Sequence, residues 1–129
     1  MFSLFSDNVW AQKAAADSIL TDAFSADIPY KGVVYATYLT LRHCPYCDMG
    51  TYSLLSMPRG KVEESTVMDG SWTVIKGSAK DENATVVELD DKNGKVVYCY
   101  LRMKDGALQE LDSHLREVKP GKDHILRKQ

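Results

Sequence analysis

Cys44 and Cys47 are separated by two residues, and His43 precedes and Met49 follows the pair. Two thiols at this spacing can form a redox-active disulfide, can share a soft metal ion, or can form a disulfide that only fixes a turn. A proline and a glycine interrupt the segment, while the residues on either side of it are β-branched, aromatic and aliphatic. The pattern therefore places both thiols at the tip of a β-hairpin.

The metal that suits this set of residues best is copper in the Cu(I) state, which binds soft thiolate and thioether donors. Cys44 and Cys47 can converge on one ion, with Met49 as a thioether ligand and His43 as an imidazole ligand. His43 and Cys44 are adjacent, so their side chains leave a regular strand on opposite sides. Only one of these two residues joins Cys47 at the metal unless the turn bends.

The tetrapeptide Cys44-Pro45-Tyr46-Cys47 is also similar to the active site of glutaredoxins, in which the first thiol lies at the start of a helix. In this alternative the protein is a thiol–disulfide oxidoreductase, with Cys44 as the nucleophile and Cys47 as the resolving thiol. Residues 48–53 are poor in helix formers, which favours a strand. The element after Cys47 separates the hypotheses, because a helix would support the oxidoreductase and a strand would contradict it.

Other residues that could serve chemistry are expected to be structural. A zinc site would need four ligands, and Cys99, His114 or His124 would have to complete it. Apolar residues alternate around Cys99, which predicts a buried position on the inner face of a strand. His114 and His124 lie in polar, turn-rich surroundings and are expected to be solvated, whereas Trp72 is expected in the core.

The composition is that of one globular domain. The chain has 129 residues, of which 44% are hydrophobic and 26% are charged, with a net charge of −2. The charges of both signs are interspersed, which argues against nucleic acid as a partner. No motif typical of a hydrolase or kinase occurs, and we expect no enzyme. The three cysteines allow one internal disulfide and leave one thiol over.

Residues 1–29 are expected to form a separate N-terminal segment. One interpretation is a short amphipathic helix capped by Asp7 or Asn8. Its inward residues would be Val9, Ala16, Ile19, Leu20 and Phe24. The other interpretation is the remnant of a secretion signal, although a basic stretch before the apolar residues is lacking.

From residue 30 onward the pattern predicts short strands separated by turns. The expected strands cover residues 30–41 (one long strand or two), 51–57, 61–68, 71–75, 84–89, 95–103, 107–111 and 123–127. Asp69-Gly70 is expected to be a hairpin turn. Strands at intervals of about ten residues favour an antiparallel meander barrel or a sandwich.

The order of these elements resembles the N-terminal domain of the NlpE family of bacterial copper-resistance lipoproteins. The resemblance rests on residues 30–33, 50–54, 70–73, 87–89, 97–100, 108–112 and 124–128. It implies an all-β fold, a small lipocalin-like β-barrel, over residues 30–129. The family usually carries its CxxC directly after the first strand, whereas here the motif lies one strand later.

The resemblance implies a function in copper resistance or envelope-stress signalling rather than catalysis. It implies a periplasmic or outer-membrane-associated location and an envelope signalling protein as partner. Cys44 and Cys47, with His43 and Met49, are the expected copper site. A lipocalin-like carrier of a small apolar ligand, with a structural CxxC, is a further alternative. A homodimer formed by strand exchange is left open.

Overall fold

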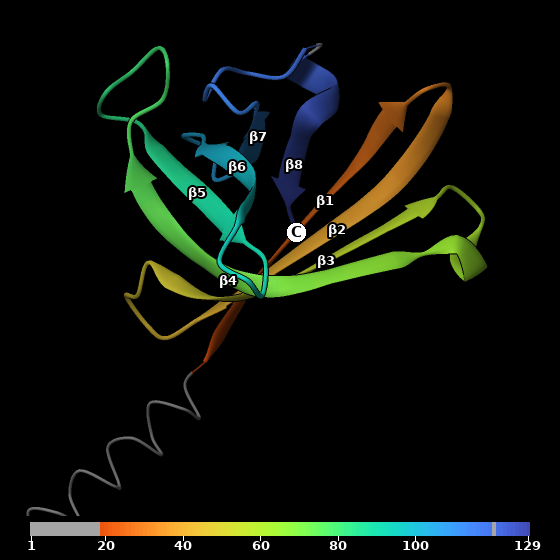
Figure 1. Ribbon diagram of the computed structural model, residues 1–129, viewed down its shortest axis with the longest axis horizontal. Coiled ribbons are helices and arrows are strands. Elements are labelled where there is room, and N and C mark those ends of the chain that lie inside the picture. Colours follow the sequence, from red (N-terminus) through yellow and green to blue (C-terminus); the bar gives the residue numbers. More distant parts are fainter. Residues whose placement is uncertain (1–18, 120) are drawn as a thin grey trace, which may run out of the picture.

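Eight antiparallel strands form a closed barrel in the computed structural model, which describes residues 19–119 and 121–129 (Figure 1). The strands are β1 (Leu20–Tyr30), β2 (Val33–His43), β3 (Met49–Pro58), β4 (Thr66–Lys76), β5 (Thr85–Asp90), β6 (Val96–Arg102), β7 (Leu108–Leu111) and β8 (Ile125–Lys128). Two short 3₁₀ helices, η1 (Val62–Glu64) and η2 (Gly121–His124), precede β4 and β8. The predicted all-β meander barrel is thereby confirmed for the described part of the chain.

The barrel closes because β8 pairs with two neighbours. Leu108 of β7 lies opposite Leu126, and Phe24 of β1 lies opposite Lys128. Each strand of the sheet therefore has a partner on both sides, which leaves no long unpaired edge. Within the described residues, no helix is long and apolar enough to span a membrane.

The first strand corrects the predicted N-terminal helix. Leu20 and Phe24, which the helix was expected to include, belong to β1, and β1 pairs with β2 along its whole length. Phe24 is buried, and Ala26 and Ile28 pack against the same core, so apolar side chains alternate along the strand as a sheet requires. The barrel thus begins at Leu20 rather than at residue 30. Ile19, also predicted to face inward, precedes β1 and is 56% exposed. Residues 1–18 of the predicted segment lie outside the described residues.

The predicted turn at Asp69-Gly70 is also wrong, because β4 continues through both residues. The chain reverses earlier, around η1. A Cβ atom at Gly70 would overlap the carbonyl oxygen of Asp90 and lie 2.9 Å from the ring of Tyr52. Glycine is therefore required at this position for close packing against the neighbouring strand and not for a turn.

Inward-facing residues fill the middle of the barrel. The main core cluster is formed by Phe24, Leu39, Leu41, Tyr52, Leu54, Trp72, Val87, Leu89, Tyr100, Leu108 and Leu126. Trp72 is in the core, as predicted. Leu39 and Leu126 have no exposed surface, so a packed layer of side chains separates the two ends of the barrel.

Cys99 is buried as predicted, but it lies on the other face of its strand. Tyr100 of β6 belongs to the main core, whereas Cys99 packs with Val86 and Leu111 in a second cluster. Leu115, from the segment after β7, covers this cluster. A layer outside the barrel therefore buries Cys99, and this layer could not be read from the alternation within β6.

Candidate redox and metal-binding hairpin

The two thiols lie in the turn that joins β2 to β3. The backbone N–H of Cys47 donates to the carbonyl oxygen of Cys44 at 3.1 Å, which closes a four-residue turn. Pro45 occupies the second position and Tyr46 the third, with Tyr46 at a φ of 61°. A proline followed by a residue with positive φ is the pattern of a type II turn. The predicted hairpin tip is confirmed.

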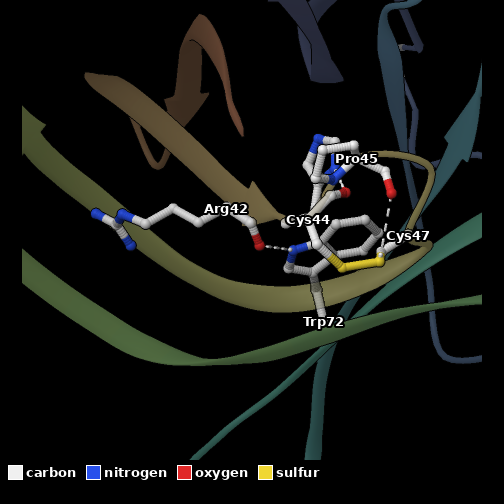
Figure 2. Close-up of a disulfide and its surroundings, with 6 residues drawn as sticks. Arg42, Cys44, Pro45, Cys47 and Trp72 are labelled. Carbon is white, nitrogen blue, oxygen red and sulfur yellow. Dashed lines mark hydrogen bonds between the residues drawn. A yellow bond between two sulfur atoms is a disulfide. The ribbon is translucent and has the colours of Figure 1, made fainter. Parts of the chain in front are cut away.

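This turn brings the Cα atoms of Cys44 and Cys47 to 5.3 Å, and the two sulfur atoms form a disulfide (Figure 2). Both cysteines are partly exposed, and the side chain of Tyr46 between them is fully exposed. The disulfide is thus within reach of solvent at the outermost point of the hairpin.

Trp72 supports the hairpin from the barrel interior. Its indole N–H donates to the carbonyl oxygen of Arg42 at 3.1 Å, as Figure 2 shows. The ring also meets His43 edge-on, with 5.8 Å between the ring centroids. A change in the conformation of the turn would therefore be transmitted to a residue of the main core.

His43 has both ring nitrogens engaged. Nε2 lies 3.0 Å from a carboxylate oxygen of Asp22, and Nδ1 lies 2.8 Å from the carbonyl oxygen of Cys44. The side chain is only 14% exposed. Lys128 approaches the other carboxylate oxygen of Asp22 at 3.6 Å. Asp22 was not identified from the sequence, because it precedes His43 by twenty-one residues and reaches it only through the pairing of β1 with β2.

Met49 begins β3, and its side chain is 62% exposed. The structure thus brings Cys44 and Cys47 into direct contact, holds the imidazole of His43 against Asp22, and leaves Met49 open to solvent. No group of three or more His, Cys, Asp or Glu side chains able to hold a metal occurs in the described part of the chain.

A cavity of about 390 Å³ lies behind the hairpin. Cys47, His43 and Trp72 line it together with Asp22, but Cys44 does not. Arg102 and Lys128 line it as well. Of the two cysteines of the disulfide, Cys47 is therefore the one that lines this cavity.

The remaining candidate ligands lie elsewhere. Burial raises the pKa of the Cys99 thiol, and the carboxylates of Glu88 and Asp90 raise it further, which keeps the thiol protonated. His114 is exposed, as predicted. His124 is not solvated as predicted, because it is only 14% exposed and its Nδ1 lies 3.0 Å from a carboxylate oxygen of Glu110.

Comparisons of the chain with protein-family models, with curated proteins and with solved structures found no match.

Proposed function

We propose that this protein is a binding or sensing module of a bacterial cell envelope, of the NlpE type, whose β2–β3 hairpin alternates between a disulfide and a dithiol. The observation that carries the proposal is the Cys44–Cys47 disulfide in an exposed turn. Disulfides persist mainly in oxidising compartments, which supports a periplasmic or outer-membrane-associated location.

Reduction of the hairpin needs an external thiol as the electron source. A thiolate attacks the sulfur of Cys47, the cysteine of the pair that lines the cavity, and a mixed disulfide forms as the Cys44 sulfur leaves. A second external thiol then releases Cys47. The balance is one protein disulfide reduced to two thiols and two external thiols oxidised to one disulfide. The turn is expected to loosen when this link is lost.

The dithiol state is the form that could take a soft metal. Cys44 and Cys47 would supply two thiolates to Cu(I), and Met49 is exposed on the same hairpin as a thioether donor. His43 would have to give up its contacts with Asp22 and with the Cys44 carbonyl to bind the ion. We therefore propose Cys44, Cys47 and Met49 as the ligands, with His43 and Asp22 positioning the turn.

The oxidoreductase alternative receives no support from the geometry. A glutaredoxin-like site needs a helix that begins at the first thiol, whereas β3 follows the turn within two residues of Cys47. The structure therefore contradicts the arrangement that this alternative requires. An envelope signalling protein as partner remains part of the proposal, since the exposed Tyr46 and the turn around it would differ between the two redox states.

The redox proposal is tested by equilibrating the protein in mixtures of reduced and oxidised dithiothreitol and trapping free thiols. A Cys99→Ala variant serves as the background, so that only Cys44 and Cys47 react. We expect one reversible two-electron transition. Circular dichroism should show that the fold is retained throughout. If the disulfide is reduced only in denaturant, it is a structural link and the proposal fails.

A further inference from the structure

A second cavity, of about 440 Å³, lies at the end of the barrel opposite the disulfide. The turn between β1 and β2 and the turn between β2 and β3 lie at opposite ends of the molecule in Figure 1. Four tyrosines, one carboxylate and one imidazole distinguish its lining, which includes Tyr30, Tyr35, Tyr98, Tyr100, Glu110 and His124. We call this space the tyrosine cavity.

The tyrosine cavity is independent of the hairpin. The two cavities share no lining residue. Leu39 and Leu126 lie between them along their strands and have no exposed surface. A ligand at one end therefore does not touch the disulfide at the other end, and the two sites can be tested separately.

The charges of the tyrosine cavity favour a cation over an anion. Among the described residues that line it, Glu110 is the one carboxylate, and no lysine or arginine occurs. His124 pairs with one oxygen of Glu110 at 3.0 Å. Burial raises the pKa of Tyr98 and holds that of Tyr100 well above its ordinary value, and in both cases Glu110 raises the pKa further. Both phenols are therefore neutral, so Glu110 is the acidic group of the lining that can face a cation.

The aromatic rings supply a second attraction for a cation. Tyr98 and Tyr100 are stacked, with 6.0 Å between their centroids, and Tyr30 meets Tyr35 edge-on at 6.4 Å. The face of an aromatic ring attracts a cation within about 6 Å of its centroid. Nζ of Lys31, which is not a lining residue, already lies 5.2 Å from the centroid of Tyr30. The rings of the cavity can thus act in the same way on a bound ammonium group.

From this combination we infer that the tyrosine cavity binds a small organic cation with an apolar body. The cationic group lies against Glu110 and the partly exposed ring of Tyr98, and Tyr100, which is 2% exposed, stacks on Tyr98 from the core. The apolar body lies against Ile28 and Leu54, which also line the cavity. An acyl carboxylate, the ligand that a simple apolar carrier would take, would face Glu110, and the imidazole of the lining, His124, is already paired with that carboxylate.

Isothermal titration calorimetry of the full chain tests this inference with three probes of similar size. They are benzyltrimethylammonium, its uncharged carbon analogue neopentylbenzene, and phenylacetate. We expect the dissociation constant of benzyltrimethylammonium to be at least about tenfold lower than that of either other probe. The contact of its charge with the rings and the carboxylate accounts for this factor. Equal or tighter binding of neopentylbenzene or phenylacetate, or no binding of the ammonium, overturns the inference.

Variants locate the binding. Glu110→Gln keeps the size of the side chain and an oxygen for His124 but removes the charge. It should weaken the binding of benzyltrimethylammonium about tenfold. Tyr98→Leu removes one aromatic ring and should also weaken the binding of this probe. Asp22→Asn, which changes a carboxylate of the hairpin cavity, is the matched control and should have no effect. If Asp22→Asn weakens binding and Glu110→Gln does not, the site is at the other end and the inference is wrong.

Discussion

Tyr52 is only 1% exposed. Its buried hydroxyl has no hydrogen-bond partner among the described residues. Among the described residues, one carboxylate oxygen of Asp90 is likewise buried without a hydrogen-bond partner. Burial raises the pKa of Tyr52, and Asp91, Asp90 and Asp69 raise it further. The ring of Tyr52 fills the core, whereas its hydroxyl is a cost to stability.

We therefore expect Tyr52→Phe to raise the free energy of unfolding by about 1 kcal/mol, because it removes an unsatisfied buried polar group and keeps the ring. Urea unfolding measures this change. Tyr46→Phe is the matched control, since the Tyr46 side chain is fully exposed, and it should leave the stability unchanged. A loss of stability in Tyr52→Phe would mean that the hydroxyl has a partner.

Tyr98 and Tyr100 predict how stability depends on alkaline pH. Burial, followed by Glu110, raises the pKa of both phenols above the ordinary value of 10.0. The unfolded chain therefore releases these protons before the folded chain does. Their contribution is fully present below about pH 10 and is lost as pH rises toward the folded pKa values. Thermal unfolding as a function of pH should show a fall in Tm above pH 10, and this fall should be shallower in Tyr98→Phe. An unchanged slope in the variant would contradict this assignment.

The β2–β3 hairpin depends on a residue of its second strand that faces inward. A Cβ atom at Gly50 would overlap the carbonyl oxygen of Arg42 and lie 3.1 Å from Nε1 of Trp72. This carbonyl is the acceptor of the indole hydrogen bond. The absence of a side chain at Gly50 thus allows Trp72 to reach the backbone of β2 and to support the turn that carries the disulfide.

Gly50→Ala should consequently destabilise the protein by about 3 kcal/mol, because the clash is with backbone atoms of β2. Chemical denaturation measures the loss. Thr51→Ala, at an exposed position on the same strand, is the control and should change stability by no more than about 0.5 kcal/mol. Equal effects of the two substitutions would show that the close approach of Trp72 to β2 is absent.

The disulfide itself should contribute modestly to stability. The cysteines are three residues apart in sequence. A disulfide across a loop this short lowers the entropy of the unfolded chain and so stabilises the fold by about 2 kcal/mol. Reduction should therefore lower the unfolding free energy of the wild type by about that amount. It should have no effect on a Cys44→Ser, Cys47→Ser double variant, and it should act on Cys99→Ala as it does on the wild type. A reduced wild type that no longer folds would contradict this expectation.

For the molecule as a whole, the local sequence pattern predicted where the strands lie. It did not predict the contacts that the strands make with one another. The turn signals predicted most strands after residue 30. The spacing of Cys44 and Cys47 left a disulfide open beside a metal site, and the structure joins the two thiols. The polar residues of β1 fitted a helix equally well, and only pairing with β2 and β8 makes this segment a strand. The Asp22–His43 and Glu110–His124 pairs also depend on strand register. Their partners are far apart in sequence, so no local pattern indicated them.

The barrel thus has two different ends separated by a packed core. One end holds the Cys44–Cys47 hairpin with Trp72 beneath it, and the other holds the tyrosine cavity around Glu110. Because the core between them includes fully buried side chains such as Leu39, the central claim of redox and metal chemistry can be tested at the hairpin alone.

The most direct test is an anaerobic titration of the fully reduced protein with Cu(I) against a competing chelator. We expect tight binding of one ion per chain, retained in Cys99→Ala and lost in the Cys44→Ser, Cys47→Ser double variant. Met49→Leu should weaken binding, since two thiolates would remain without the thioether. If the wild type and the double variant bind Cu(I) equally weakly, the hairpin is not a soft-metal site, and this part of the proposed function is wrong.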